Sequence, residues 1–477
     1  MKRIFLLLTL IASIHLHAQE TGYEIKISFK PFKNEYIYLG HYMGKQLPII
    51  DSIKLNDKSE GSFKGAKSLP GGIYLIGYPN KNGFFEILID KQQHFSVIAD
   101  TSNLMNSIQF VHSLDNTLFN EYQKFMNAHG KEMEGAGKNY TTAKSKADSA
   151  KWNDQLKQLN DSVKSYRNTI LKDHPASMMA FLLNAMKEPE LPATDKQPKG
   201  DSLFSYKYLK SHFWDGVNFY DGRLLRTPFF ESRIDKYFEQ LVYPSADSVI
   251  KEIDWMMSYA NINEDMQKFL LLKFLNRYLN QKYMWEDAIF VHLYEKYFSN
   301  KTYSWLTEAG KKTITERAYS LMANIFGSPA ADIDLPDVNG KKTNLYNVRA
   351  EFILVCIWDP TCGHCKETLP KLDSVYQQKW KAYGLKVFSL AKETDGNKED
   401  WLAFIAKYNL QSWINVYYSK EADNSRINSG SPGYSQLYDV KSFPTLYLLD
   451  KDKRIIAKKL SFEQIDEVLN HKLNLPK

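Results

Sequence analysis

All three cysteines of this 477-residue chain, Cys356, Cys362 and Cys365, fall within ten residues near its C-terminal end. The continuous apolar run Phe352–Trp358 stands before the last two and predicts a strand that is buried on both faces. From about residue 363 to residue 383 the sequence shows a helical pattern instead. The pair Cys362 and Cys365 is therefore predicted to stand where a buried strand ends and a helix begins.

From Asp332 onward the sequence alternates between predicted strands and predicted helices. After the elements around the cysteines we expect a strand over Leu385–Leu390, a helix over Lys398–Tyr408, a strand over Ile414–Tyr418, a short helix over Tyr434–Tyr438, a hairpin of Leu446–Leu449 with Arg454–Leu460, and a helix that begins at Ser461. The order β-α-β-α-β-α-β-β-α is that of the thioredoxin fold. Residues 330–477 are therefore predicted to form a thioredoxin-like α/β domain.

A chain of this length is expected to form roughly two to four domains, and the residues before residue 330 show two other patterns. Residues 19–112 contain short segments of period-two alternation, such as Tyr23–Phe29, and predict a small all-β domain, either a sandwich or a barrel. Residues 113–325 are predicted to be α-helical, because apolar side chains recur there at helical spacing. The stretch Gly327–Ala331 is predicted to be a linker.

The N-terminal segment has the pattern of a secretory signal peptide. Lys2 and Arg3 precede the apolar run Ile4–Ile14, which is too short to span a membrane comfortably, and Ala18 follows. Residues 1–18 are therefore predicted to be a signal peptide that is cut after Ala18. Its removal would leave a soluble protein in the periplasm or another extracytoplasmic compartment.

Charges of both signs are mixed along the chain and give a formal net charge of +7. No basic stripe is present, so the sequence argues against nucleic-acid binding. Arg223 and Arg226 are expected either to hold a carboxylate of a partner or, by the simpler interpretation, to form internal ion pairs. Histidines such as His112 and His471 show no ligand spacing, and we expect neither a metal nor a cofactor.

The spacing of Cys362 and Cys365 favours thiol-disulfide exchange. The N-terminus of a helix carries a partial positive charge and free N–H groups, and both stabilise a thiolate. We therefore expect Cys362 to attack a disulfide and Cys365 to resolve the mixed disulfide that forms. A cationic His364 would further stabilise the Cys362 thiolate and make the pair more oxidising than that of thioredoxin.

The C-terminal α/β region resembles the TlpA/ResA-like branch of the thioredoxin superfamily. The resemblance rests on Asp334–Lys341, on Trp358 four residues before Cys362, on the two cysteines, on Pro370 five residues after Cys365, and on Phe443-Pro444-Thr445. It implies a thiol-disulfide oxidoreductase with a cis-proline at Pro444 opposite the dithiol. It also implies that Gly363 and Trp358 support the dithiol, while Phe443 and Thr445 bind the substrate chain.

The regions ahead of this domain carry weaker resemblances. The segments Asp51–Lys54, Gly61–Phe63 and Pro70–Tyr74 resemble a β-rich domain often found before secreted thioredoxin-like domains, and the stretch 212–228 resembles a helical module of exported bacterial proteins. Exported family members usually reduce disulfides with electrons from a membrane transporter. The resemblance thus implies a disulfide-bearing protein substrate and a membrane electron donor.

Some positions depart from the family pattern. Thioredoxins carry a buried acid where this chain has Cys356, which we interpret as an inert buried cysteine. ResA-like proteins often carry a glutamate where this chain has Thr368. The candidate proton acceptors for the second cysteine are therefore Asp359, Glu367 or water. In addition, Phe443 is bulkier than the residues often found before the family proline.

Other functions stay open. The sequence Cys-Gly-His-Cys resembles the motif of disulfide isomerases, so an isomerase or oxidase is an alternative to a reductase. Pro360 and Thr361 lie too close to Cys362 for a peroxiredoxin motif. A protein of another class, a binding or scaffold protein with a dispensable redox domain, is the third possibility.

Overall fold

The structure is a computed structural model that describes residues 22–198 and 200–474. The chain forms two compact units: one runs up to Val242 and includes Met256–Phe269, and the other consists of Tyr243–Trp255 and Leu270–Lys477. The predicted signal peptide lies outside the described residues. None of the helices within the described residues has both the length and the apolar character that crossing a bilayer requires.

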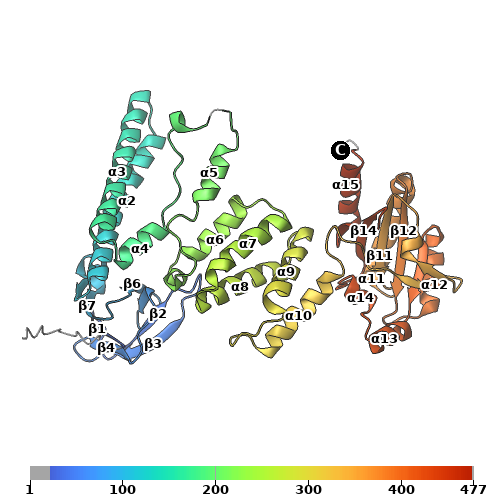
Figure 1. Cartoon of the computed structure of the whole chain (residues 1–477), viewed down its shortest axis with the longest axis horizontal. Coiled ribbons are helices and arrows are strands. Elements are labelled where there is room, and N and C mark those ends of the chain that lie inside the picture. The colour runs from blue at the N-terminus through green and yellow to red at the C-terminus, as the bar shows by residue number, and fades with distance from the viewer. Residues whose placement is uncertain (1–21, 199, 475–477) are drawn as a thin grey trace, which may run out of the picture. The chain divides into compact units, whose positions relative to one another are not determined.

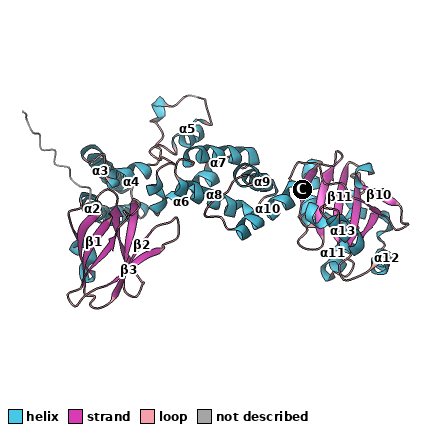
Figure 2. Cartoon of the chain, turned by 60° about the horizontal axis from the view of Figure 1, so that its bottom comes forward, coloured by secondary structure: helices cyan, strands magenta, loops and turns pink. Residues whose placement is uncertain are grey.

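The N-terminal region of the first unit is a β-sandwich. Its strands are β1 (Tyr23–Lys30), β2 (Tyr36–His41), β3 (Ile49–Lys54), β4 (Glu60–Gly65), β5 (Gly72–Gly77), β6 (Phe84–Ile89), β7 (His94–Asp100) and β8 (Gln109–Val111). They form two four-stranded sheets with the orders β4-β1-β7-β8 and β3-β2-β5-β6, drawn in magenta in Figure 2. Ile25, Ile27 and Phe29 of β1 alternate into the core that the sheets share. The predicted all-β region is confirmed, and its two separate sheets make it a sandwich, not a barrel.

The middle of the chain is helical, as predicted. Its helices are α2 (Leu114–Thr141), α3 (Lys146–Asp173), α4 (Met178–Ala185), α5 (Phe204–His212), α6 (Phe230–Gln240), α7 (Ala246–Ala260), α8 (Glu264–Leu279), α9 (Asp287–Leu293) and α10 (Glu308–Met322). The long helices α2 and α3 lie side by side (Figure 1). Ser113 and Ser145 start them, because each serine side chain accepts a hydrogen bond from a backbone N–H of the first turn.

The two arginines singled out in this region form internal contacts. The Arg223 guanidinium lies 2.7 Å from a carboxylate oxygen of Asp221 and 3.1 Å from one of Asp90. Arg226 is buried and forms an ion pair of 3.7 Å with Asp265. The simpler interpretation of this pair, internal ion pairing, therefore accounts for both side chains.

The C-terminal α/β region is built around a five-stranded sheet. Its elements are β9 (Asp334–Pro336), β10 (Lys342–Asn344), β11 (Phe352–Trp358), α11 (Gly363–Val375), β12 (Leu385–Lys392), α12 (Lys398–Lys407), β13 (Ile414–Tyr418), α13 (Lys420–Asn428), α14 (Tyr434–Leu437), β14 (Thr445–Asp450), β15 (Ile455–Lys458) and α15 (Phe462–Lys472). The sheet order is β13-β12-β11-β14-β15, with β11 parallel to β12 and antiparallel to β14. The apolar run of β11 is buried against helices on both faces, as predicted.

The stretch Gly327–Ala331 is held by the sheet and is not a free linker. The Gly327 N–H donates to the carbonyl oxygen of Ile455 at 2.9 Å, and the Ile455 N–H donates to that of Ser328 at 3.0 Å. These bonds occupy the otherwise open edge of β15. Local composition gave no sign of this pairing, because the partner strand lies far along the chain. The domain limits predicted from the sequence stay predictions.

A buried lysine joins β15 to the helices of the same unit. The ammonium of Lys458 donates to the backbone carbonyl of Asn324 at 2.6 Å and to its side-chain oxygen at 3.0 Å. It also forms an ion pair with Asp287, and the two side chains are only 3% and 5% exposed. Three acceptors therefore compensate the burial of this charge.

Candidate functional site

Cys362 occupies the N-cap position of α11. Its sulfur accepts a hydrogen bond from the backbone N–H of Cys365 at 3.4 Å, and it lies 3.7 Å from the carbonyl oxygen of Phe443. The side chain is partly exposed, so another disulfide can reach the sulfur. A backbone N–H of the first turn and the positive end of the helix dipole are thus both directed at this sulfur. The junction of strand and helix thus lies where the sequence predicted it.

Cys365 has a different environment on the first turn of the same helix. Its side chain is fully buried, and it is not bonded to Cys362 in this structure. Burial raises the pKa of the Cys365 thiol above its ordinary value, while a hydrogen bond with the backbone of Asp359 opposes this effect. An accessible sulfur and a buried sulfur with a raised pKa therefore stand next to each other.

The cis-proline loop, residues 438–444 between α14 and β14, brings Phe443 and Pro444 opposite the cysteines, and Thr445 follows as the first residue of β14. The peptide bond between Phe443 and Pro444 is cis, as predicted. Thr445 is buried, and its hydroxyl donates to the carbonyl oxygen of Ser442 at 2.6 Å. Because β14 pairs directly with β11, the strand that leads to the dithiol, the sheet sets the position of this loop.

The two candidate proton acceptors differ in their surroundings. Asp359 is buried, and its carboxylate accepts hydrogen bonds from the backbone N–H of Thr361 at 2.6 Å, from the Thr361 hydroxyl at 2.7 Å and from the Thr394 hydroxyl. Glu367 is exposed on α11. Across residues 22–198 and 200–474, neither carboxylate is hydrogen-bonded to Cys365. Their role as proton acceptor stays a prediction.

The two residues between the cysteines are exposed. His364 stands on the wall of a cavity, and Gly363 has no neighbouring atom within 4 Å of the place where a side chain would begin. A larger residue at Gly363 would therefore meet no steric obstacle inside the domain. In the part of the chain that the structure describes, no group of three or more His, Cys, Asp or Glu side chains is arranged to hold a metal ion.

Two further residues of β11, Cys356 and Trp358, are buried in the strand that leads to the dithiol. Trp358 is buried, and its indole N–H donates to the hydroxyl of Ser389 at 2.7 Å. Its ring lies 4.6 Å from that of Phe404, measured between centroids. Cys356 is fully buried as predicted, and burial raises the pKa of its thiol. The C-terminal end of β11 is thus held in place by packing and by one buried hydrogen bond.

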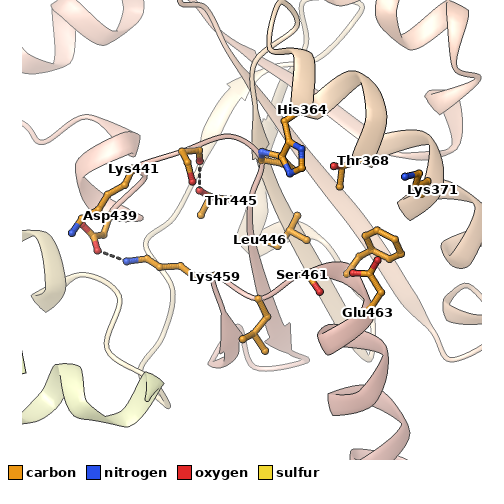
Figure 3. A pocket seen from close by; sticks show the side chains of 14 residues that line it. His364, Thr368, Lys371, Asp439, Lys441, Thr445, Leu446, Lys459, Ser461 and Glu463 are labelled. Atoms are coloured by element: carbon orange, nitrogen blue, oxygen red, sulfur yellow. Dashed lines mark hydrogen bonds and ion pairs between the residues drawn. The ribbon is translucent and has the colours of Figure 1, made fainter. Parts of the chain in front are cut away.

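A cavity of about 420 Å³ opens beside the dithiol (Figure 3). His364, Thr368 and Lys371 line it from α11, Pro444 lines it from the cis-proline loop, and Thr445 lines it from the start of β14. The remaining lining residues come from 439–446 and 459–463, and they include Asp439, Lys441, Lys459, Leu460, Ser461, Phe462 and Glu463.

Sequence reasoning did not find several side chains that hold or line this site. Ser389 and Thr394 come from β12 and its exit loop, and they bind Trp358 and Asp359 across the sheet. Lys441 lies three residues before Pro444, so proximity to the predicted cis-proline was the only available signal for it. None of these positions carries a local motif, because the contacts form only when the strands pair.

Comparison with known proteins gives two matches to family models. A model described as thioredoxin-like matches residues 350–455, and a domain of unknown function (DUF5106) matches residues 138–324. Thiol-disulfide oxidoreductase ResA of Bacillus thuringiensis is 26% identical over 147 residues, which cover 30% of this chain and 76% of the relative. ResA of Bacillus subtilis is 24% identical over 169 residues, which cover 35% of this chain and 80% of the relative.

Solved structures also resemble parts of the chain. A thioredoxin-like protein from Bacteroides caccae is 24% identical and covers 59% of this chain and 97% of its own, with a TM-score of 0.42. Because that score is low, the fold assignment rests on the strand order, the cis-proline and the family model. The C-terminal region of this chain is thus a thioredoxin-like domain, and it is similar to the thiol-disulfide oxidoreductase ResA of both Bacillus species.

Proposed function

We propose that the protein is an exported reductase of disulfides in other proteins and that Cys362 and Cys365 carry its chemistry. The observation that supports this most is the contrast between the two sulfurs: one is accessible at a helix N-terminus, and the other is buried with a raised pKa. A nucleophile needs access and a stabilised thiolate, and Cys362 has the surroundings for both.

In the proposed reaction, the Cys362 thiolate attacks one sulfur of the substrate disulfide. The substrate S–S bond breaks, its other sulfur leaves as a thiolate, and a mixed disulfide forms. Cys365 then gives its proton to a base, for which Asp359, Glu367 and water are the candidates, and its thiolate attacks the sulfur of Cys362. The mixed S–S bond breaks, and the second substrate thiolate leaves. The substrate gains two electrons, and the protein is left with a Cys362–Cys365 disulfide. A dithiol donor, predicted to be held in the membrane, would return the electrons.

The mechanism is tested by trapping the mixed disulfide. A Cys365→Ser variant should accumulate a covalent adduct with a disulfide-bonded peptide, because the resolving sulfur is absent. A Cys362→Ser variant should form no such adduct, although it keeps the other cysteine. Mass spectrometry under non-reducing conditions measures both. Adduct formation through Cys365 in the absence of Cys362 would reverse the proposed roles.

The direction of electron flow has a second candidate. His364 stands exposed beside the dithiol and favours an isomerase or oxidase if its positive charge stabilises the thiolate. The equilibrium potential against glutathione decides between them, with a variant that lacks both cysteines as the blank. A strongly negative potential supports the reductase. A potential close to that of disulfide isomerases would transfer the assignment to isomerisation or oxidation.

The proposed export rests on the N-terminal pattern alone. Expression of the full chain in a bacterial host followed by cell fractionation measures the location of the mature protein. We expect it outside the cytoplasm, with Gln19 as its first residue. Recovery of a full-length chain from the cytoplasm would contradict both the predicted cleavage and the proposed compartment.

A further inference from the structure

The cavity beside the dithiol carries more positive than negative charge. Three lysines line it, Lys371, Lys441 and Lys459, together with two carboxylates, Asp439 and Glu463. The lysines come from α11, from the cis-proline loop and from the chain after β15, so they surround the cavity and do not lie along one helix (Figure 3). Such a cavity attracts an anionic group.

One of the two carboxylates, that of Asp439, already has two positively charged partners. Asp439 is buried, and it accepts a hydrogen bond from Arg317 of α10 at 2.8 Å and forms a second ion pair with Lys459 (Figure 3). Arg317 is itself held by Gln281 at 2.6 Å and is only 12% exposed. The cluster of Asp439, Arg317 and Lys459 thus carries one more positive than negative charge, even before Lys441 is counted.

Lys441 has no such partner. Within the residues that the structure describes, no carboxylate lies within ion-pair distance of its ammonium, and the side chain is exposed to the cavity. Partial burial lowers the pKa of Lys441, and the positive charges of Arg317 and Lys459 act in the same direction against the opposing effect of Asp439. The ammonium therefore stands among further positive charges, and no carboxylate of the described residues is in ion-pair contact with it.

The position of this field relative to the reacting sulfur matters. Lys441 lies on the same short loop as Phe443, whose carbonyl oxygen is 3.7 Å from the Cys362 sulfur. The cavity wall includes His364 between the cysteines and Pro444 opposite them. A polypeptide joined to Cys362 by a disulfide would therefore have its residues next to the cysteine at the mouth of this cavity.

We propose that the cavity binds a carboxylate of the polypeptide segment that flanks the cysteine attacked by Cys362, with Lys441 as the specificity-determining residue. This inference rests on the proposed function. An acidic side chain fits because its carboxylate meets the unpaired ammonium, while its methylene groups meet the apolar wall formed by Leu446, Leu460 and Phe462. Protein substrates with acidic residues beside the reactive cysteine would be reduced in preference to others.

Two matched peptides test the inference. Each carries one cysteine as a mixed disulfide with 2-thiopyridine, a neutral leaving group whose release is followed by absorbance. One peptide has Glu on both sides of the cysteine, and the other has Gln. We expect the reduced full-length protein to react about tenfold faster with the Glu peptide at low salt, and this ratio to fall as added salt screens the charges.

Variants of the protein assign the preference to the cavity. Lys441→Gln should lower the ratio to about two, and Lys441→Glu should favour a peptide with Lys in place of Glu. The matched control is Lys451→Gln, which removes an exposed lysine directly after β14, whereas Lys441 precedes that strand. The six residues of β14 separate the two positions by about 20 Å, so the ratio should stay at about ten.

The outcomes separate the inference from the proposed function. If the wild-type protein reacts equally fast with both peptides, or if Lys441→Gln keeps the full ratio, the inference is wrong and the proposed function stands. If neither peptide reacts although both cysteines are reduced, the proposed function fails and the inference fails with it.

Discussion

Arg223 in the first unit and Lys441 in the C-terminal domain differ in how their positive charges are compensated. Arg223, in the first unit, is neutralised by Asp221 and Asp90 and also lies 4.0 Å above the ring of Phe181. Lys441, beside the dithiol, has no carboxylate partner among the described residues. Arg223 lies in the short 3-10 helix Gly222–Arg226, and Lys441 lies on the loop between α14 and β14. An unpaired charge next to a reactive group is available to bind a ligand, whereas a charge that is paired inside the protein stabilises the fold.

The largest expected effect concerns the reactive group itself. Replacing Cys362 with Ser should lower the rate of disulfide exchange by at least about a thousandfold, because a hydroxyl does not ionise near neutral pH. The measurement is 2-thiopyridone release from a peptide disulfide. The control is Cys356→Ala, which removes the third, fully buried sulfur and should keep the rate. Exchange that survives in Cys362→Ser would move the chemistry elsewhere.

A second test compares a buried and an exposed ion pair. Replacing Asp287 with Ala leaves the Lys458 ammonium buried without its counter-charge, and we expect the free energy of unfolding to fall by about 3 kcal/mol. Urea unfolding followed by tryptophan fluorescence measures the change.

The control for this pair lies in the first unit. Glu190→Ala breaks the ion pair between Glu190 and Lys164, whose side chains are 72% and 55% exposed, respectively. It should change the free energy of unfolding little. Equal effects of the two substitutions would show that burial does not set the difference between these pairs.

Asp439 provides a pH-dependent test. Burial alone would raise the pKa of this carboxyl, but the hydrogen bonds from Lys459 and Arg317 outweigh burial and lower the pKa below its ordinary value. A lowered pKa contributes stability above the unfolded value and loses that contribution as the pH falls through the folded value. Asp439→Asn should therefore lower the free energy of unfolding by about 2 kcal/mol near neutral pH, and this difference should shrink below about pH 4. Unfolding curves of both proteins from pH 7 to pH 3 measure this. A constant difference over that range would contradict the lowered pKa.

The smallest expected effect returns to Arg223. Arg223→Gln should lower the free energy of unfolding by about 1 kcal/mol, since it removes partly buried ion pairs. It should leave the preference for the Glu peptide unchanged. A loss of that preference would connect the first unit to substrate selection and would remove the contrast with Lys441.

The sequence by itself determined the local features of this protein. The period-two pattern of β1, the buried run of β11 and the start of α11 at the cysteines were all predicted, because side-chain spacing and helix starts depend on nearby residues. The cis-proline at Pro444 followed from the family resemblance.

Only the tertiary structure decided the surroundings of these features. The bond from Trp358 to Ser389, the binding of Asp359 by Thr394 and the pairing of Gly327–Ala331 with β15 join segments that lie far apart in the chain. The same holds for the cavity, whose excess charge arises where α11, the cis-proline loop and the chain after β15 meet. All of these contacts have the same physical cause. Contacts between distant segments depend on strand pairing and packing, and the residues that make them show no periodic pattern in the sequence.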